Sequence, residues 1–453
     1  MRSSRQRTKP RAPSSNTELD DRLVRGIARL GELDRRRLDT WLDYVDSHQS
    51  DDADEDDNGG LGQDEDDRPA YSWTQARLVK SHLRDNRYSN IAAWDHALLP
   101  GLYLNASLIP PLPFAPDTKG KGRNGQAYIA SQAPLPHTFP TFFAHLCAQH
   151  VRVLVMLTPL EERGAPKADR YWPSQAEQTQ SSLSSRLYDA GAHIFHHQAG
   201  GGAAAAKPRM NLGSTGWSVD LLEERELSTG PPLDPSSSST SQHPRALPQG
   251  TLLHLRHLRL HIGSHTSPAD CQSISSSSSS SSRPEHSPPH QDLFQLHLSS
   301  WADWGADSLE TLDILLDWID HLQQSSQPLQ TQTSPSIPPI WIHCSAGVGR
   351  SGTVIAAHIL RHLPTSSTTS KLVPASAVPE DRDRAYLLAD CNLAEGEGEG
   401  EEGDDDLAQC IAVVAYLRRY RPSMVQTPAQ LGMIYEAGAS IRERAKSEGT
   451  ELA

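Results

Sequence analysis

The chain has little cysteine, and the few cysteines are scattered. Five occur in 453 residues, an odd number with no C-x-x-C pair. This usage fits a reducing compartment rather than a disulfide framework, and it offers no cysteine-based zinc site. His343, next to Cys344, does not have metal-ligand spacing either. The sequence therefore predicts neither a metal nor a cofactor. The cysteines are Cys147, Cys271, Cys344, Cys391 and Cys410.

Long apolar runs and an excess of positive charge are also missing. Apolar residues make up 36% of the chain and the mean hydropathy is -0.56, so much of the chain cannot belong to a core. No run approaches membrane-spanning length, and the N-terminal MRSSRQRTKPRAPSSN lacks the apolar region of a signal peptide. The net charge of -14 argues against a nucleic-acid or anionic-membrane binder. We expect a soluble, cytoplasmic protein, with nuclear access left open.

The most informative stretch runs from Ile340 to Thr353 and reads IWIHCSAGVGRSGT. A short β-prone run leads into a glycine-rich turn, and Val354 to Leu360 continue as a helical pattern, which predicts strand, turn and helix. Backbone N–H groups and the helix dipole favour an anion at such a turn. Arg350 offers a planar fork for two phosphoryl oxygens, and the same field favours the thiolate of Cys344. A thiolate below a bound phosphoryl group can take that group covalently.

Three other interpretations of this turn compete. Gly347 to Gly352 matches G-x-G-x-x-G, the dinucleotide fingerprint, which is a weak signal alone. The glycine spacing also suits a nucleotide-binding P-loop, but Thr353 stands where lysine is required, so that interpretation fails. Cys344 could also be an ordinary buried cysteine, the commonest fate of this residue. The rest of the chain has to separate these options.

Helix and strand patterns alternate along the chain. Apolar residues at helical spacing predict one or two amphipathic helices from Thr17 to about Tyr44. Val151 to Leu157 is almost entirely apolar, as is typical of a central strand buried on both faces. Thr251 to Ile262 and Leu293 to Leu298 are predicted to pair as antiparallel strands. Further strands are predicted at 103–109, 127–130 and 340–342, and further helices at 74–82, through 143–146, from 308, at 354–360, at 407–419 and from 427.

Polar, low-complexity segments interrupt this alternation and cannot bury enough surface to fold. The first contains only weak strand signals, near Ser185 to Phe195 and Trp217 to Leu222. We predict disordered insertions near 174–249, 264–290 and 364–406. The predicted organisation is a basic tail, an amphipathic helical segment and an acidic linker at 1–67, one α/β domain at 68–446, and a C-terminal tail at 447–453.

The central motif resembles that of a known family. HCSAGVGRSGT is similar to the H-C-x5-R-[ST] signature of the intracellular, tyrosine-specific protein tyrosine phosphatases, and six further blocks resemble that family in the expected order. They are NRY at 86–88, YLNASLI at 103–109, YIASQAPLP at 128–136, KADRYWP at 167–173, WADWG at 301–305 and MVQTPAQ at 424–430. The resemblance spans most of Asn86 to Tyr435. It implies an α/β (α+β) fold with a central, twisted, mixed β-sheet flanked by helices, and hydrolysis of phosphotyrosine in proteins without metal.

The resemblance also implies roles for the reacting groups. Cys344 would be the nucleophile, and Asp303 the general acid on a loop that closes over substrate. Gln426 would position the water of the second step, with Gln430 nearby. Ser351 would hydrogen-bond the cysteine sulfur. Phosphate would be held by Arg350 and by the turn residues Ser345, Ala346, Gly347, Val348 and Gly349.

Supporting roles follow in the same way. Glu162 would pair with Arg350, although the adjacent Glu161 competes for that role. Lys167 would lie near the acid loop, and His343 would support the nucleophile. Tyr88 would form an aromatic wall that makes the pocket too deep for phosphoserine. From the residues alone, Ser351 and Gln430 could equally be helix-starting residues, and Tyr88 a core aromatic.

Three positions depart from the family pattern. Ala302 replaces the usual proline of the acid loop, which should loosen that loop. Asn90 stands where an aspartate grips the substrate backbone, and Ser423 where glycine is common. These departures, with the long insertions, keep a second hypothesis open: a phosphatase-like module that binds phosphotyrosine but turns it over poorly. A phosphoinositide substrate is disfavoured because the turn from Ser345 to Gly349 carries no basic residue. The N-terminal helical segment is expected to pack on the domain; the alternative is a partner-binding helix whose partner is unknown.

Overall fold

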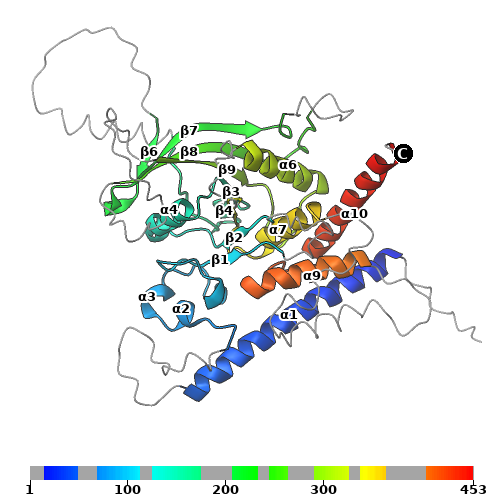
Figure 1. Cartoon of the computed structure of the whole chain (residues 1–453), viewed down its shortest axis with the longest axis horizontal. Helices are drawn as coiled ribbons and strands as arrows, with labels where there is room; N and C mark the ends of the chain where they lie inside the picture. Colours follow the sequence, from blue (N-terminus) through cyan, green and yellow to red (C-terminus); the bar gives the residue numbers. More distant parts are fainter. Residues whose placement is uncertain are drawn as a thin grey trace, which may run out of the picture.

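In the computed structural model of the chain, the described residues are 15–48, 69–112, 125–174, 207–232, 244–263, 290–325, 337–363 and 405–451. They form a mixed, eight-stranded sheet with helices on both faces, as predicted (Figure 1). The strands are β1 (Ala106–Ile109), β2 (Tyr128–Ser131), β3 (Val153–Met156), β4 (Glu161–Glu162), β5 (Ala165–Pro166), β6 (Arg209–Asn211), β7 (Ser218–Leu227), β8 (Leu253–His261), β9 (His290–Leu298) and β10 (Ile340–His343). The helices are α1 (Ser15–His48), α2 (Thr74–Arg77), α3 (Lys80–Leu83), α4 (Phe139–Ala148), α6 (Leu309–Ser325), α7 (Gly349–Arg361), α9 (Asp405–Tyr420) and α10 (Pro428–Glu451), with 3-10 turns η2 (Asp95–Ala97), η3 (Pro136–Thr138) and η4 (Gly213–Thr215).

Parallel strands form the centre of the sheet. The strand order is β1-β2-β10-β3-β9-β8-β7-β6. Strand β10 pairs in parallel with β2 and β3, and β3 pairs in parallel with β9, whereas the outer strands are antiparallel. The carboxyl end of β10, where the predicted turn begins, therefore lies at the middle of the sheet. β4 and β5 form a separate two-stranded ribbon.

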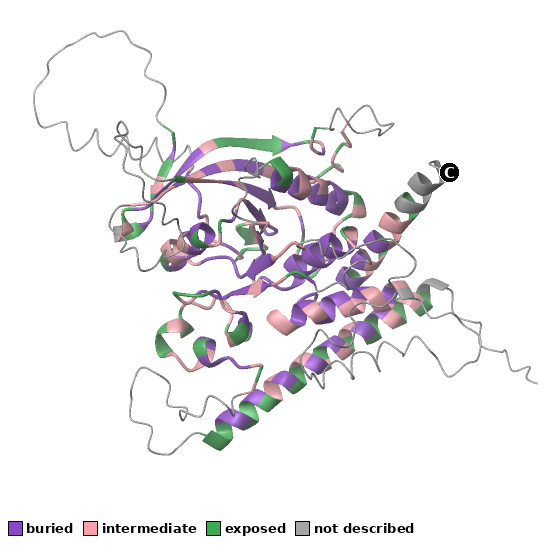
Figure 2. Ribbon diagram, in the orientation of Figure 1, coloured by how far each residue is buried: buried purple, intermediate pink, exposed green. Residues whose placement is uncertain are grey.

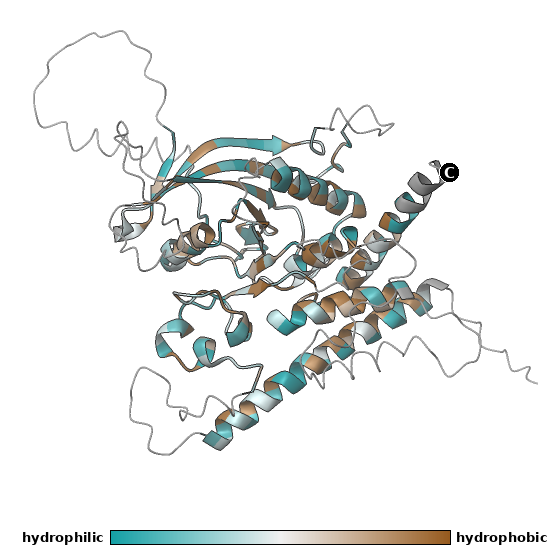
Figure 3. Ribbon diagram, viewed as in Figure 1, coloured by the Kyte–Doolittle hydropathy of each residue, from teal (hydrophilic) through white to brown (hydrophobic). Residues whose placement is uncertain are grey.

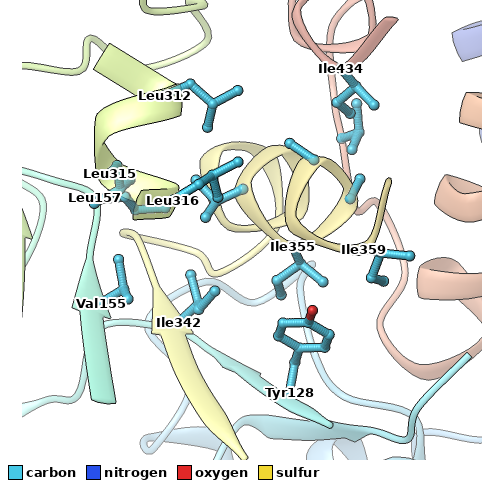
Figure 4. Close-up of a cluster of buried hydrophobic side chains, with 14 of the residues drawn as sticks. Tyr128, Val155, Leu157, Leu312, Leu315, Leu316, Ile342, Ile355, Ile359 and Ile434 are labelled. Atoms are coloured by element: carbon cyan, nitrogen blue, oxygen red, sulfur yellow. The ribbon is translucent and has the colours of Figure 1, made fainter. Parts of the chain in front are cut away.

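Both faces of the central strands are buried, because neighbouring side chains point to opposite sides of a strand. Trp341 belongs to the cluster on the α4 face and meets Phe142 edge to face. Ile342 belongs to the cluster built with α6, α7 and α10, where it lies near Val155 (Figure 4). Fully burying an aliphatic side chain of this size contributes about 1.5–3 kcal/mol. The turn after β10 is thus anchored in both halves of the core.

The first helix is a single helix of 34 residues, where one or two had been predicted. Buried and exposed residues alternate along it, and its buried stripe faces α9 and α10 (Figures 2 and 3). Leu23 and Leu30 join the cluster that contains Ile342, and the Cα of Gly26 lies against Ile411 and Leu431. The N-terminal helix is therefore part of the main core, although the predicted domain division places it outside.

A buried carboxylate ties α1 to the segment that precedes α10. Asp34 Oδ2 accepts hydrogen bonds from the Ser423 N–H at 2.8 Å and from Arg418 Nη1 at 2.9 Å. Arg418 in turn donates from Nε to Met424 O at 2.8 Å and from Nη2 to Val425 O at 2.7 Å. Burial raises the pKa of Asp34 despite the attraction of Arg418. The carboxylate and the guanidinium together hold three consecutive backbone units.

Several predicted elements are confirmed and others need correction. The β8–β9 pair is antiparallel, with register from Leu253↔Leu298 to His261↔His290. Ser308 caps α6 by accepting the Thr311 N–H at 3.0 Å. The predicted helix at 74–82 is instead two short helices, because the backbone at Val79 is extended.

The first predicted insertion, 174–249, is not low-complexity throughout. It contains β6 and β7, and β7 covers most of the weak signal at 217–222. Four consecutive side chains of β7, from Glu223 to Glu226, are polar and largely exposed, which masks the strand alternation in the sequence. The signal at 185–195 lies outside the described residues, as do positions 264–289 and 364–404 of the other two insertions. No helix in the described part of the chain has the length and apolar character needed to cross a membrane.

Candidate active site

The turn between β10 and α7 depends on glycines at two close approaches. Gly347 has φ +73°, and a Cβ atom there would lie 1.9 Å from Ser131 O. A Cβ atom at Gly352 would lie 2.7 Å from the Val425 N. Neither distance tolerates a side chain. The glycines in this motif are therefore required by the backbone packing around the turn.

The Cys344 thiol lies buried inside this turn. Its exposed fraction is 3%, and the Gly347 N–H points at Sγ from 3.2 Å. Burial raises the pKa of the thiol. The charge of Arg350, the Ser351 hydroxyl and the N–H groups of Ser351 and Val348 lower it by more, so the pKa of Cys344 is lowered overall. The thiolate is thus favoured over the thiol relative to a free cysteine.

Ser351 is buried next to Arg350, and its hydroxyl is among the groups that lower the pKa of Cys344. Among the described residues, its Oγ accepts no backbone N–H. Its position fits the predicted role as a donor to sulfur better than a helix cap, because a capping hydroxyl would accept a backbone N–H.

His343 precedes Cys344 and contacts the backbone that carries the thiol. Burial lowers its pKa to about 4, so the imidazole is neutral near pH 7. Its Nδ1 lies 3.0 Å from Cys344 O and its Nε2 lies 2.6 Å from the Tyr171 hydroxyl. A carbonyl only accepts, so Nδ1–H donates to it and the Tyr171 hydroxyl donates to Nε2. Gln295 Nε2 donates to the same hydroxyl at 2.7 Å. This chain of hydrogen bonds fixes the backbone that carries the thiol.

Arg421 is a site residue that the sequence analysis missed. It is fully buried and donates from Nε to Gly347 O at 2.8 Å, from Nη2 to Ala346 O at 2.9 Å and from Nη1 to Asn105 Oδ1 at 2.9 Å. Burial lowers its pKa to about 10, so it stays charged at neutral pH. By holding these carbonyls on the far side of the turn, Arg421 leaves the Gly347 N–H directed at Cys344. Its only sequence signal is its place just before the MVQTPAQ block.

The loop with the predicted acid is docked onto Arg350. Arg350 Nη1 donates to Trp301 O at 2.9 Å, and Nη2 contacts Asp303 Oδ1 at 3.0 Å. Lys167 Nζ lies 2.7 Å from the other carboxylate oxygen of Asp303, and this contact raises the pKa of Lys167. The Asp303 carboxylate therefore lies between two cations, one of which belongs to the turn around Cys344.

The same loop is tightly folded and carries an exposed aromatic ring. The buried Trp301 donates from Nε1 to Gly305 O at 2.9 Å, and the Gly305 N–H donates to Ala302 O at 3.3 Å. Trp304 has φ +61° and is 60% exposed. A positive φ is costly for a bulky residue. Ala302 is accommodated in this loop without the proline that the family pattern has there.

Glu162 contacts a different partner from the one expected. The resemblance implied an ion pair with Arg350, but Glu162 Oε1 accepts the Asp303 N–H at 3.1 Å. The guanidinium of Arg350 is already engaged by Trp301 O and Asp303. Glu161, the competing residue, is exposed on β4. Glu162 therefore holds the backbone of the acid loop rather than the arginine.

The two predicted glutamines lie beside the start of α7. A Cβ atom on Gly349 would lie 2.7 Å from Gln426 Oε1 and 3.0 Å from Gln430 Nε2, one residue before Arg350. Gln430 Oε1 accepts the Gln426 N–H at 2.8 Å, and the Gln430 N–H donates to Thr427 Oγ1 at 3.2 Å. Both carboxamides thus reach the turn that holds the thiol, and Thr427 caps α10 as predicted.

Tyr88 lies at the rim of the turn. Its hydroxyl is 2.7 Å from Ser345 Oγ, and Ser345 itself donates to Lys167 O at 2.6 Å. Since Ser345 has one proton, Tyr88 is the donor in their contact. The half-buried ring is therefore fixed beside the turn. Asn90 is exposed, and Ser423 contacts Asp34 through its backbone.

A protein-family model described as protein-tyrosine phosphatase matches residues 82–187 and 248–378, together more than half of the chain. These ranges contain thirteen of the fifteen predicted site residues. They are Tyr88, Glu162, Lys167, Asp303, His343, Cys344, Ser345, Ala346, Gly347, Val348, Gly349, Arg350 and Ser351. Gln426 and Gln430 lie beyond the matched ranges, so their assignment rests on their position beside Gly349.

Several characterised proteins are similar in sequence. Tyrosine-protein phosphatase 99A of Drosophila melanogaster is 26% identical over 282 residues, which is 60% of this chain and 15% of that protein. A Lar-like tyrosine-protein phosphatase of Caenorhabditis elegans is 36% identical over 136 residues, 28% of this chain and 6% of that protein. Receptor-type tyrosine-protein phosphatase S of Gallus gallus is 34% identical over 128 residues, 26% and 8% respectively. The chain thus matches at most 15% of the length of these relatives.

Among solved structures, PTPN18 in complex with HER2-pY1196 phosphopeptides aligns with 82% of this chain and 86% of its own, at 18% sequence identity and a TM-score of 0.46. The family model carries the assignment, because it matches more than half of the sequence. The chain belongs to the protein-tyrosine phosphatase family.

Proposed function

We propose that this protein hydrolyses phosphotyrosine in proteins through a covalent phosphocysteine. The observation that carries the proposal is the convergence of three groups on one anion site. A buried thiol with a lowered pKa lies in a turn whose N–H groups point inward, Arg350 lies at the end of that turn, and the Asp303 carboxylate from a separate loop contacts Arg350. These are the nucleophile, the phosphate-binding cation and the acid that phosphoryl transfer needs.

In the first step, Cys344 Sγ attacks phosphorus and the bond from phosphorus to the tyrosyl oxygen breaks. The electron pair passes to the phenolic oxygen, which takes a proton from the carboxylic acid form of Asp303. The substrate dianion competes with the Asp303 side chain for Arg350 Nη2, because the phosphoryl oxygens would use the donor that Asp303 Oδ1 contacts. Substrate binding would thereby release the Asp303 side chain toward the leaving oxygen.

In the second step, a water molecule attacks phosphorus while the Asp303 carboxylate takes its proton. The bond from sulfur to phosphorus breaks, and its electron pair returns to Cys344 as the thiolate, favoured by Arg350 and the Ser351 hydroxyl. Gln426 Oε1, which lies against Gly349, accepts a hydrogen bond from this water and orients it. Inorganic phosphate then leaves, and the enzyme is regenerated without metal or cofactor.

Selectivity for phosphotyrosine would come from the depth of the site. The thiol is 3% exposed, so the phosphoryl group must reach it on a long, narrow side chain. Tyr88, fixed by Ser345 at the rim, provides a flat surface for the phenyl ring of the substrate. A phosphoserine side chain is too short to pass this rim and still reach the sulfur.

We further propose that the catalytic groups lie within about 68 to 446, with α1 packed against this unit as part of the same core, and that the protein is of the intracellular, non-receptor type. Among the described residues, Cys147, Cys344 and Cys410 form no disulfide, which fits a reducing cytoplasmic environment. Cell fractionation with an antibody to the native chain tests this placement. Recovery in a membrane fraction that resists salt and carbonate extraction would contradict it.

A catalytically weak, phosphotyrosine-binding module is the second candidate. The observation that favours it is the acid loop, where Asp303 is held between Arg350 and Lys167 and the next residue, Trp304, has a positive φ. A loop held in this way, with Ala302 in place of proline, could close slowly. In that case the protein would bind phosphotyrosine and release little phosphate.

Phosphate release from phosphotyrosine peptides by the full chain separates the two candidates. We expect release that vanadate blocks and EDTA does not, that Cys344→Ser abolishes, and that is much smaller for the matching phosphoserine peptides. Asp303→Asn should keep peptide binding and lower kcat by about 10²–10⁴-fold. Glu310→Gln, an exposed carboxylate on α6, is the matched control. Tight peptide binding without turnover by the native protein would favour the binding module instead.

A further inference from the structure

Three side chains of α6 and α7 meet at a point that takes no part in the proposed phosphoryl transfer. Asp320 Oδ1 lies 3.0 Å from His358 Nε2 and 2.9 Å from His362 Nε2. The three atoms lie within 4.8 Å of one another. His358 is eight residues after Arg350 on the same helix, or about 12 Å along its axis. The cluster is therefore separate from the Cys344 site.

The local structure explains why these groups converge. His358 and His362 are four residues apart, so they share one face of α7, and their ring centroids are 4.6 Å apart. Asp320 projects from α6, which packs beside α7 in the core (Figure 4). His358 is buried, whereas the side chain of His362 is 50% exposed. The cluster thus has a buried floor and an open side.

His358 and Asp320 each contact a further side chain outside this cluster of three. The Tyr128 hydroxyl lies 2.7 Å from His358 Nδ1, and in Figure 4 it points from β2 toward α7. Arg361 Nε lies 3.3 Å from the second carboxylate oxygen of Asp320, and Arg361 also contacts Asp317. Metal-binding histidines and carboxylates are typically oriented by such partners.

We propose that Asp320, His358 and His362 bind one divalent transition-metal ion of the zinc class. Two imidazole nitrogens and one carboxylate oxygen are ligands that zinc accepts, and water would complete the coordination on the exposed side of His362. Each imidazole would present the lone pair of Nε2 and carry its proton on Nδ1. For His358 that proton faces the Tyr128 hydroxyl oxygen, and for His362 it faces solvent. The ligand atoms are close enough that small side-chain rotations admit the ion.

Binding would join two helices with functional loops at their N-terminal ends. α6 follows the loop of Asp303, and α7 follows the turn of Cys344. A metal ion between α6 and α7 would therefore stabilise the relative position of both loops, independently of whether the protein is a phosphatase. Because the ion binds the folded protein in particular, it would raise the temperature of unfolding.

Calorimetric titration of the full chain with Zn²⁺ tests the proposal. The Cys344→Ser variant serves as the parent, since it removes the reactive thiolate as a competing ligand. We expect one equivalent of Zn²⁺ to bind, Co²⁺ to give the visible absorption of a four-coordinate site, and the unfolding temperature to rise. His362→Ala should weaken binding at least about 10-fold and remove the shift in unfolding temperature.

Two further variants make the result specific. His321→Ala removes a neighbouring α6 histidine that meets Trp318 edge to face, and it should bind Zn²⁺ like the parent. Asp320→Asn keeps the size of the side chain and should weaken binding as His362→Ala does. His362 is half exposed, so its replacement should leave the fold intact, which circular dichroism checks. Failure of the parent to bind, or equal binding by the parent and His362→Ala, would overturn the proposal.

Discussion

Replacing Asp34 by alanine should destabilise the folded protein and also lower kcat, although Asp34 takes no direct part in the proposed reaction. Asp34 lies on α1, outside the residues that the family model matches. Its carboxylate accepts the Ser423 N–H and neutralises Arg418 in a buried setting. The variant leaves the guanidinium with the carbonyl groups of Met424 and Val425 but without a counterion.

The magnitude follows from these contacts. Breaking a buried ion pair by removing one partner costs about 3–5 kcal/mol. The lower end of this range applies here for two reasons. Arg418 keeps the carbonyl groups of Met424 and Val425 as acceptors. Burial of the Asp34 anion is itself unfavourable, as its raised pKa shows. A loss of about 3 kcal/mol corresponds to a fall of about 6 °C in Tm, at roughly 2 °C per kcal/mol, the lower end of the range for domains of about 150–250 residues, because the folded part of this chain is larger.

Activity should fall as well. Ser423 and Val425 have φ values of +63° and +60°, which are strained for residues other than glycine. This segment leads directly into Gln426, so its relaxation would displace the group proposed to orient water. We expect kcat to fall more than KM rises, and phosphoenzyme trapped by rapid quenching to increase, because the second step is the one affected.

Thermal unfolding and burst kinetics check this prediction, with Asp39→Ala as the control. Asp39 lies on the same helix in an exposed ion pair with Arg35, at 2.6 Å. Such exposed pairs contribute little to stability, so its loss should leave both Tm and kcat near those of the native protein. If Asp34→Ala behaved like Asp39→Ala, the coupling of α1 to the Gln426 segment would be refuted.

Three further predictions concern the site itself. Gly347→Ala should abolish vanadate binding, measured by fluorescence titration, because its methyl group would meet a carbonyl oxygen 1.9 Å away; retained binding would contradict the steric argument. Alkylation of Cys344 by iodoacetamide should persist well below pH 8.5, since the thiol pKa is lowered, and Arg350→Met should move this profile to higher pH. Glu162→Ala should lower kcat by roughly 10-fold through loss of a charged hydrogen bond, whereas the exposed Glu161→Ala should not; equal effects would refute the acid-loop assignment.

Local patterns gave the elements that surround the turn. The strand β10, the turn and α7 follow from an apolar run, a glycine cluster and a second apolar run that are contiguous in sequence. The β8–β9 pair follows from alternation in both strands. β7 gave only the weak signal at 217–222, because both faces of the strand are exposed from Glu223 to Glu226 and no period of two appears there.

Contacts between distant parts of the chain could not be predicted in this way. Arg421 holds a carbonyl 74 residues earlier, and Asp34 binds a backbone N–H 389 residues later. Neither pairing leaves a trace in local hydrophobic periodicity. Glu162 contacts the Asp303 N–H and not the Arg350 side chain that was expected. The choice between these two donors depends on how the acid loop folds. The two histidines of α7 are visible as an i, i+4 pair, but Asp320 lies 38 residues before the first of them.

The way in which β8 and β9 end has a practical consequence. His261 and His290 are directly paired across the two strands, so the chain leaves and re-enters the sheet at adjacent points. The pairing of the eight residue pairs below them does not depend on how many residues connect the two ends. Residues 264–289 therefore mark a position where a small fluorescent or affinity domain with neighbouring termini can be inserted. Such a fusion would report on the folded sheet while leaving both helical faces and the Cys344 turn untouched.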